Sequence, residues 1–480
     1  MAVDRAPSKE SWRRRTKIVA TIGPTSDSPA LLERLIKAGV DTTRQNFSHG
    51  TAQYHEKLFK RIRKVSRLVG KPIACLADLQ GPRIRVGRLK DGRAVQLVRG
   101  AEVRLNAASA PGDAQNIPVR FEQVQASIKP GHRVLIADGA IELRVLKAKG
   151  GEFLCRVARG GLLGEHKGVN LPDTPLRLPG LTAKDHSDAR VIARLGFDYV
   201  ALSFVRSGEH VRELRRLLER LGSRAHIIAK IENPRAVRNL DEILDASDGI
   251  MVARGDLAVE TSPGAVPVLQ KEIIRRTNQR SKIVITATEM LASMIDHPQP
   301  TRAEASDVAN AVFDHTDATM LSGETASGSY PVESVRTMSE ILIQAERYRP
   351  KSAADDFPAG RTFTHAAVHS AVIAAETVQA HCIAVFTHSG NTALIASEAR
   401  PGCPIVALTP LEETRRRLAL VWGVTPVHRP RVHTFEKMMR TGAEALLKTG
   451  LARPGQTVVF VAGTSLRSGA TNVVRIDKLS

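Results

Sequence analysis

The stretch IIAKIENP, residues 227–234, begins like a buried strand and then places two opposite charges side by side. Its isoleucines suit a strand that is covered on both faces. Lys230 and Glu232 are two residues apart, so they point to the same side of an extended chain. Taken alone, such a pair is most often a strand end that reaches solvent with a weak ion pair. The rest of the chain decides whether it is functional.

Seven further runs share this short, apolar and β-branched character, and helix-length segments separate most of them. The eight runs are residues 17–22, 42–47, 73–78, 199–204, 226–231, 249–254, 283–288 and 318–323. Eight β-α units are the number in a closed (β/α)8 barrel. The predicted fold class is therefore α/β, with a TIM barrel as its central domain.

Two regions depart from this rhythm. After the third strand, turn-separated alternating runs such as RVLIADGAIELRVLKA (133–148) predict an inserted small all-β barrel domain. Beyond residue 350, the runs CIAVFT, PIVALT and TVVFVAG alternate with helical segments and predict an open-sheet α/β domain. The expected domains are a catalytic barrel (1–85 and 184–349), a β-barrel lid (86–183) and a C-terminal regulatory domain (350–480).

The composition is that of a soluble globular protein, with 42% apolar and 25% charged residues. The net charge of +21 favours anionic partners, and a nucleic-acid-binding protein has to be considered. However, only 4% of the residues are aromatic, which leaves few platforms for base stacking. The basic residues are also spread along the whole chain, and small anionic substrates explain the bias equally well.

Targeting and metal-cluster signals are missing from the sequence. No apolar run is long enough to cross a bilayer, and the polar start has no hydrophobic signal core. The four cysteines are scattered, without a C-x-x-C motif, which argues against zinc and against a disulfide framework. A reducing cytoplasm is the expected location.

The barrel interpretation places polar residues at the same end of five strands. Active sites of such barrels collect at the carboxyl ends of the strands. Scattered surface charge would not select one end, so the functional interpretation of Lys230 and Glu232 is favoured. The residues at these strand ends are Arg44, Asn46, Ser48, Asp78, Lys230, Glu232, Arg254, Gly255, Asp256 and Thr288.

These residue types favour metal-assisted phosphoryl transfer. Glu232 and Asp256 end neighbouring strands, and their oxygens suit Mg²⁺ or Mn²⁺. Lys230 and Arg44 point to the same mouth and could hold a phosphoryl group, whose transfer requires positioning and charge neutralisation. Gly255, within ARGD (253–256), lets backbone N–H groups approach an anion.

With these residues in place, the chain resembles pyruvate kinases along nearly all of its length. The matching stretches are TKIVATIGP (16–24), RQNFSHG (44–50), ADLQGPRIR (77–85), KGVNLP (167–172), LTAKD (181–185), SFVR (203–206), IIAKIEN (227–233), DGIMVARGDL (248–257), ITATEML (285–291), PTRAEASDVANAV (300–312) and MLSGETASG (320–328). The resemblance implies the reaction of phosphoenolpyruvate with ADP to give pyruvate and ATP. The alternative is a basic nucleic-acid-binding or regulatory protein on an inactive kinase scaffold.

The resemblance also implies a role for each residue at the mouth. Lys230 stabilises the transferring phosphoryl group and Arg44 contacts the phosphate. Glu232 and Asp256 hold the divalent ion, Mg²⁺ or Mn²⁺. Gly255 and Asp256 seat the substrate carboxylate through backbone N–H groups, and Thr288 takes part, with water, in delivering the proton to C3.

Four further residues face the nucleotide by the same resemblance. They are Arg85 and Lys167, the latter carried in by closure of the lid, together with Asn46 and His49. For His49, a packing role in a barrel loop is an equally good interpretation.

A potassium ion is expected to be dispensable. Many pyruvate kinases hold K⁺ by groups that match Asn46, Ser48, Asp78 and the carbonyl of Leu79. They usually carry Thr-Lys and a Glu where this chain has Leu79-Gln80 and Arg83. A guanidinium supplies the positive charge itself. The alternative is that Arg83 merely pairs with Asp78 or with a carboxylate of the lid.

Four positions near the predicted site depart from the usual pyruvate kinase pattern. Gln45 replaces an apolar residue, Glu289 a Gln, Ala137 an Asp and His315 a Gly. Because every principal catalytic group is present, these departures bear on rate and nucleotide affinity more than on activity itself.

The C-terminal domain carries a second phosphate-type loop, THSGNT (387–392), between a strand and a helix. Ser-Gly turns before helices are common without any ligand. The loop resembles the one that holds effector phosphates in regulated pyruvate kinases, and GTSLRSGATN (463–472) corresponds to its flexible lid. We expect a phosphorylated effector of open identity, and a homotetramer, with the effector bound by Thr387, Ser389, Gly390, Asn391, Thr392 and Arg467.

Overall fold

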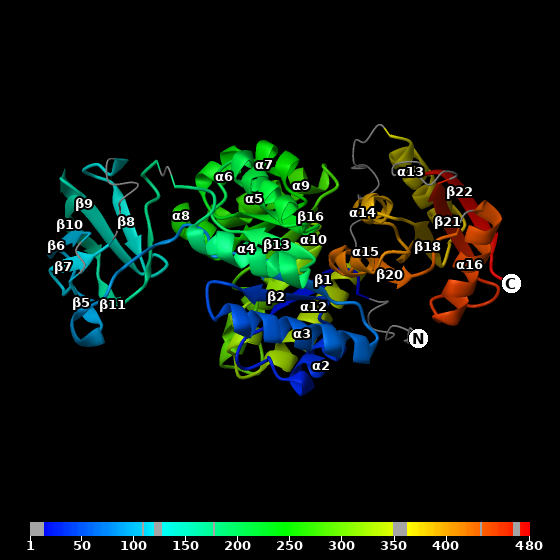
Figure 1. Cartoon of the computed structure of the whole chain (residues 1–480), viewed down its shortest axis with the longest axis horizontal. Helices are drawn as coiled ribbons and strands as arrows, with labels where there is room; N and C mark the ends of the chain where they lie inside the picture. The colour runs from blue at the N-terminus through cyan, green and yellow to red at the C-terminus, as the bar shows by residue number, and fades with distance from the viewer. Residues whose placement is uncertain are drawn as a thin grey trace.

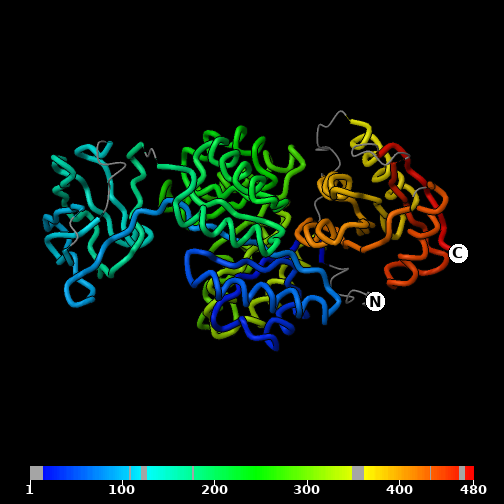
Figure 2. Tube along the Cα trace, viewed as in Figure 1, coloured from blue at the N-terminus to red at the C-terminus, as the bar shows by residue number. Residues whose placement is uncertain are grey.

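The computed structural model describes residues 14–107, 110–119, 127–175, 178–348, 362–432, 434–463 and 471–480. Three bodies lie in a row, with the barrel in the centre, the inserted β domain on one side and the C-terminal domain on the other (Figure 1). Figure 2 shows that the chain passes from the barrel to the β domain and back through two separate segments. The β domain is therefore joined to the barrel by a double connection.

The eight predicted barrel strands are all present, which confirms the TIM barrel. They form a closed parallel sheet in the order β1-β17-β16-β15-β14-β13-β3-β2. The strands are almost entirely buried, as expected when helices cover the outside and packed side chains fill the inside. Their bounds are β1 (Lys17–Thr21), β2 (Thr42–Asn46), β3 (Ala74–Asp78), β13 (Tyr199–Leu202), β14 (His226–Ile231), β15 (Gly249–Ala253), β16 (Ile283–Ala287) and β17 (Ala318–Leu321).

Local sequence signals set the ends of the outer helices. Before α4, Thr182 accepts from the Asp185 N–H while Asp185 accepts from the Thr182 N–H, a reciprocal capping box, and Gly196 ends the helix at φ 73°. No described helix has the length and apolar content needed to cross a membrane. The barrel helices are α2 (Pro29–Ala38), α3 (Ala52–Val69), α4 (Ala183–Leu195), α5 (Gly208–Arg220), α6 (Pro234–Arg238), α7 (Leu240–Ala246), α8 (Arg254–Glu260), α9 (Val266–Asn278), α10 (Arg302–Phe313), α11 (Gly323–Ala326) and α12 (Pro331–Arg347).

The inserted domain is a curled β-sheet over its own apolar core. Seven strands pair in the order β4-β12-β8-β9-β10-β6-β7, and a bridge between Val86 and Val119 links its two ends. Alternate residues of β6 and β10 are buried, which is the period-two pattern that predicted this domain. The strands are β4 (Ile84–Arg85), β5 (Val95–Leu97), β6 (Glu102–Asn106), β7 (Asn116–Pro118), β8 (Arg133–Ile136), β9 (Ile141–Lys149), β10 (Glu152–Arg159), β11 (Gly161–Leu163) and β12 (Gly168–Asn170).

The C-terminal domain is the expected open α/β sheet, in the order β20-β19-β18-β21-β22. Its two edge strands, β20 and β22, escaped prediction because Pro426 interrupts one and exposed charged residues dilute the other. The elements are α13 (Phe363–Thr377), β18 (Cys382–Phe386), α14 (Asn391–Glu398), β19 (Ile405–Thr409), α15 (Glu412–Arg417), β20 (Val424–His428), α16 (Phe435–Lys448), β21 (Thr457–Gly463) and β22 (Thr471–Lys478).

The C-terminal domain closes the amino end of the barrel. One apolar cluster runs without a break from barrel residues such as Leu76 and Met251 to C-terminal residues such as Leu418. Tyr199 OH donates to the Arg417 carbonyl at 2.9 Å, and Lys17 Nζ donates to the Val424 carbonyl at 2.9 Å. The opposite end of the barrel, which faces the β domain, is therefore the end that remains available for chemistry.

Candidate active site

Lys230 is the last residue but one of β14, at the carboxyl end of the barrel, hereafter the mouth, and is buried. Its Nζ lies 2.8 Å from Glu232 Oε1 and donates to Ser203 Oγ at 2.8 Å. Asp78 Oδ1 is 3.5 Å away. Burial alone would lower the pKa of Lys230, but the charges of Asp78 and Glu232 outweigh it and raise the pKa. Lys230 is therefore a permanent cation at the mouth.

Glu232 presents a buried oxygen with spare hydrogen-bonding capacity. Its Oε2 accepts from the Phe204 N–H, whereas its Oε1 has no well-aligned hydrogen bond within the described part of the chain. Burial raises the pKa of Glu232, and the negative charge of Asp256 raises it further. The positive charge of Lys230 lowers the pKa but does not cancel these effects. A buried carboxylate with open lone pairs next to a second carboxylate fits a hard divalent cation.

Glu232 and Asp256 are the two carboxylates at the mouth that could coordinate a divalent cation. Within the described ranges, no cluster of three or more His, Cys, Asp or Glu side chains has metal-binding geometry. Mg²⁺ sites in phosphate-handling enzymes commonly use one or two carboxylates, with water and substrate phosphate oxygens as the remaining ligands. Glu232 and Asp256 fit that pattern.

Thr288 follows β16 in a left-handed backbone conformation, with φ 68°, which a β-branched residue rarely adopts. Its Oγ1 accepts from the Gly255 N–H at 2.8 Å and its hydroxyl donates to the Ala287 carbonyl at 2.7 Å. Arg254 Nη2 donates to the Thr288 carbonyl at 2.8 Å and Arg254 also pairs with Asp307 at 2.6 Å. Strain that surrounding contacts maintain is typical of functional positions.

Arg44 and Asp78 form a buried pair beside Lys230. Arg44 Nε donates to Asp78 Oδ2 at 2.7 Å, and Arg44 Nη1 donates to Thr21 Oγ1 at 3.0 Å. Burial would raise the pKa of Asp78, but the charges of Lys230 and Arg44 lower it on balance. Two cations therefore already neutralise Asp78.

Arg83 lies between the lid and the mouth. Its Nη2 is 2.8 Å from Asp138 of the lid and 3.8 Å from Asp256. Pairing with a lid carboxylate, the alternative to a monovalent-ion role, is thus present. A side chain at Gly168 would begin 2.7 Å from the Arg83 guanidinium, so this glycine keeps space for it.

The predicted nucleotide residues come from two domains. Arg85 of β4 donates to the His166 carbonyl at 3.1 Å, and Gly168, directly after the exposed Lys167, pairs with Arg85 across the sheet. In the barrel, Asn46 accepts from the Ser48 N–H at 3.1 Å, and His49 is exposed. Their contact with a nucleotide remains a prediction.

Three of the four departures from the pyruvate kinase pattern occupy left-handed backbone. Ala137, Glu289 and His315 have φ of 53°, 54° and 67°. Glycine adopts this conformation without strain, which explains why a Gly is usual where His315 stands. The fourth departure, Gln45, is buried and lies 3.2 Å from a ring nitrogen of His55.

The loop Thr387–Thr392 lies where the sequence placed it, between β18 and α14. Gly390 has φ 100°, its N–H donates to Thr387 Oγ1 at 3.0 Å, and the Asn391 N–H donates to Ser389 Oγ at 3.4 Å. Thr392 Oγ1 is 2.9 Å from Thr471 Oγ1. Arg467 lies outside the described residues.

Three residues of the site were missed as functional candidates. Ser203 bridges Lys230 and Asp78, Asp138 pairs with Arg83, and Glu260 accepts from the Asn170 amide of the lid at 2.7 Å. Arg254, which the sequence placed at the mouth without a role, holds the Thr288 loop. Ser203 lies in SFVR, so its matching stretch could have identified it, whereas the other contacts depend on the packing of distant segments.

A (β/α)8 barrel with paired cations and carboxylates at its mouth, under a β-domain lid, defines a barrel phosphotransferase. Known proteins agree with this class. The family model described as pyruvate kinase, barrel domain, matches residues 13–335, and the pyruvate kinase alpha/beta domain matches residues 365–477. The chain belongs to the pyruvate kinase family.

Individual relatives match over almost the full length. A pyruvate kinase of Agrobacterium vitis is 44% identical over 97% of this chain and 98% of its own length. One from Geobacillus stearothermophilus is 42% identical over 98% of this chain and 81% of its own length. The crystal structure of a pyruvate kinase from Cryptosporidium parvum has a TM-score of 0.93 at 34% identity, covering 99% of this chain and 98% of that one. None of these matches supports a nucleic-acid-binding scaffold.

Proposed function

We propose that this chain transfers the phosphoryl group of phosphoenolpyruvate to ADP, giving pyruvate and ATP. The observation that carries the proposal is the placement of Lys230 beside the open carboxylate oxygen of Glu232 at the barrel mouth. Phosphoryl transfer depends on positioning and on charge stabilisation more than on covalent chemistry by the protein. A fixed ammonium group next to a cation-binding carboxylate supplies both.

Within this proposal, Lys230 neutralises the charge that develops on the transferring phosphoryl oxygens. Arg44 contacts the same phosphate from β2, keeping its hydrogen bond to Asp78. Gly255 and Asp256 would receive the substrate carboxylate at the start of α8 through their backbone N–H groups, which for Gly255 replaces its hydrogen bond to Thr288 Oγ1. Thr288, whose Oγ1 lies 2.8 Å from the Gly255 N, would with water deliver the proton to C3 through its hydroxyl.

Glu232 and Asp256 would hold the divalent cation, Mg²⁺ or Mn²⁺, which supplies Lewis-acid neutralisation of phosphate oxygens when bound. Arg85, Lys167, Asn46 and His49 would contact the nucleotide, with Arg85 and Lys167 carried by the lid. Closure of the lid would exclude water from the reacting groups.

Asn46, Ser48, Asp78 and Leu79 match the usual ligands of K⁺, but the enzyme is proposed to be active without this ion. Asp78 already has Arg44 at 2.7 Å and Lys230 at 3.5 Å, so its charge needs no further ion. Arg83 adds a permanent positive charge within 3.8 Å of Asp256.

Regulation is proposed to act through the loop Thr387–Thr392. A cavity of about 710 Å³ lies between the C-terminal domain and the amino end of the barrel, hereafter the base. It is lined in part by Ser389, Gly390 and Asn391, and also by Lys282 and Arg417. A phosphorylated effector that binds there would contact both domains. The protein is further proposed to be a cytoplasmic homotetramer, a location consistent with its free cysteines.

The test is a coupled assay of pyruvate formation from phosphoenolpyruvate and ADP with Mg²⁺. We expect turnover that depends on all three, and on the carboxylates Glu232 and Asp256 when these are changed to Gln and Asn. Absence of turnover together with tight, salt-sensitive binding of RNA or DNA would favour the scaffold alternative.

A further inference from the structure

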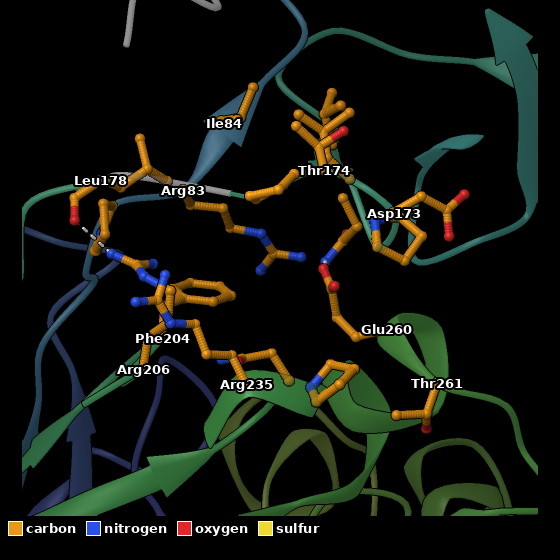
Figure 3. A pocket seen from close by; sticks show the side chains of 18 of the residues that line it. Arg83, Ile84, Asp173, Thr174, Leu178, Phe204, Arg206, Arg235, Glu260 and Thr261 are labelled. Carbon is orange, nitrogen blue, oxygen red and sulfur yellow. Dashed lines mark hydrogen bonds between the residues drawn. The ribbon is translucent and has the colours of Figure 1, made fainter. Parts of the chain in front are cut away.

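A second cluster of cationic side chains lies beside the mouth, in a cavity of about 770 Å³ between the lid connection and the barrel. Neither Lys230 nor Asp256 lines it. Figure 3 shows the guanidinium groups of Arg206 and Arg235 side by side next to Phe204, with Arg83 reaching in from the lid connection. Arg238 completes the barrel wall.

The arginines of the barrel wall have no acidic partners among the described residues. Within the described ranges, Arg206, Arg235 and Arg238 form no ion pair with a carboxylate. Arg206 is only 6% exposed, yet its Nη2 donates only to the carbonyls of Leu178, at 2.7 Å, and Pro179, at 3.2 Å. Buried arginine is normally paired with an acid, so this arrangement calls for an explanation.

The acids that line the cavity are already engaged by groups of the lid. Asp173 is held by Arg133 at 2.8 Å and 3.0 Å, and Glu260 accepts from Asn170 at 2.7 Å. They therefore leave the charges on the barrel wall uncompensated.

The electrostatics of the neighbouring groups show the same excess of positive charge. Burial, and after it the charge of Arg235, lowers the pKa of Arg206 to about 10. Burial and then the charges of Arg206 and Arg235 lower the pKa of His210 to about 4. Neighbouring cations contribute to the lowered pKa of both Arg206 and His210, and an anion placed among the arginines would relieve that repulsion.

We infer that this cavity is a binding site for a small, multiply charged anion, held by Arg206, Arg235 and Arg238 and separate from the phosphoryl-transfer site. Guanidinium groups bind phosphate and carboxylate oxygens by pairs of parallel hydrogen bonds. A phosphate ester and a polycarboxylate share this chemistry. Because the cavity walls come from both the lid connection and α6, the bound anion contacts both parts.

The test uses inorganic phosphate as the probe, in calorimetric titrations of the full-length protein without divalent ions. The double variant Arg235→Gln/Arg238→Gln removes two exposed arginines of the cavity. Arg190→Gln/Arg220→Gln is the matched control, since both are exposed helical arginines outside the cavity. Phosphate sites at the mouth or in the C-terminal domain are common to all three proteins, so a difference reports on the cavity.

We expect the cavity variant to lose one phosphate equivalent, or to bind it at least about tenfold more weakly, while the control matches the wild type. Equal stoichiometry and affinity in all three proteins would overturn the inference, as would the absence of this binding event in the wild type. Parallel titrations with glycerol 3-phosphate and tricarballylate distinguish a phosphate ester from a polycarboxylate as the preferred ligand.

A second variant tests the charge argument directly. Arg235→Glu places a carboxylate beside Arg206, and we expect it to raise the melting temperature without phosphate and to abolish the phosphate-dependent rise. A lower melting temperature with the phosphate response retained would contradict the inference, because the arginines would then not form an anion-binding site whose charge is uncompensated.

Discussion

The two ends of the barrel strands hold the same kinds of charged residues in different states. At the amino end, Asp198 accepts hydrogen bonds from Arg63 at 2.7 Å, from the Cys75 N–H at 2.8 Å and from Arg416 at 2.9 Å. At the mouth, Glu232 has an oxygen with no well-aligned donor among the described residues, although Lys230 is next to it.

The covering of the strand ends differs as well, although left-handed backbone occurs at both ends, since Ser281 and His315 at the amino end also have positive φ. Phe204, Thr288 and Glu289 follow barrel strands at the mouth, and all have positive φ. At the base, the C-terminal domain covers the strand ends with a continuous apolar cluster. The comparison teaches that the C-terminal domain covers the strands at one end, whereas the other end, under the β domain, holds the groups that would bind ligands. The predictions below test the expected role of one end of the barrel or of the neighbouring domains.

The largest expected effect is on turnover at the mouth. Lys230→Met should leave binding of phosphoenolpyruvate and metal largely intact but lower kcat by about 100- to 1000-fold, since one group that stabilises transition-state charge contributes about 3–4 kcal/mol. Steady-state kinetics measure this, and Lys57→Met, at an exposed position of α3, is the control. A fall of less than tenfold would make Lys230 a structural partner of Glu232.

At the base, the expected effect is on stability. Asp198→Asn should destabilise the protein by about 3 kcal/mol because it leaves Arg63 and Arg416 without their shared carboxylate. The shift of the thermal midpoint measures this, while kcat of the folded enzyme should stay within about twofold. Asp245→Asn, at an exposed position, should change neither. A large loss of kcat at unchanged stability would show that Asp198 serves catalysis rather than stability, which would contradict the comparison.

Low pH should also destabilise the amino end of the barrel. Burial would raise the pKa of Asp41, but Arg14, Lys71 and Lys17 lower it to about 2. Because this folded-state pKa lies below the unfolded value, the stabilisation is present above about pH 4 and is lost as the pH falls toward 2, at most about 2.5 kcal/mol. Denaturant titrations at several pH values should show a shallower acid dependence in Asp41→Asn. An unchanged slope would mean that Asp41 is not involved.

A smaller effect is expected for the monovalent ion. The unaltered enzyme should be active in Tris or tetramethylammonium buffers free of K⁺ and NH₄⁺, whereas Arg83→Glu should acquire roughly tenfold stimulation by K⁺, equivalent to about 1.4 kcal/mol of charge compensation. Initial rates at constant ionic strength measure this. Strong stimulation of the unaltered enzyme would show that Arg83 serves only its pair with Asp138.

The smallest effect should come from the loop of the C-terminal domain. Combining Ser389→Ala with Arg467→Gln should weaken the response of the apparent KM to a phosphorylated effector, by several-fold, and leave basal activity unchanged. Saturation curves with a panel of sugar phosphates and nucleoside monophosphates measure this. Hyperbolic curves that none of these compounds changes in the unaltered enzyme would refute the proposed regulation.

The sequence predicted the barrel strands and the residues at their ends because both depend on local patterns. Apolar β-branched runs mark buried strands, and the carboxyl end of each strand is known once the barrel is recognised. The edge strands β20 and β22 were missed for the opposite reason. An edge strand is half exposed and tolerates Pro426 or charged residues, so its pattern is weak.

By itself, the sequence determined that Lys230, Glu232, Asp256 and Thr288 occupy the mouth of an eight-stranded barrel. Only the tertiary structure decided which charges they meet there. Asp138 is 55 residues from Arg83 in sequence, and Arg206, Arg235 and Arg238 share a cavity whose acids, Asp173 and Glu260, are engaged by groups of the lid. Electrostatic partners depend on distances of a few ångströms between segments far apart in the chain, and local residue patterns carry no information about those distances.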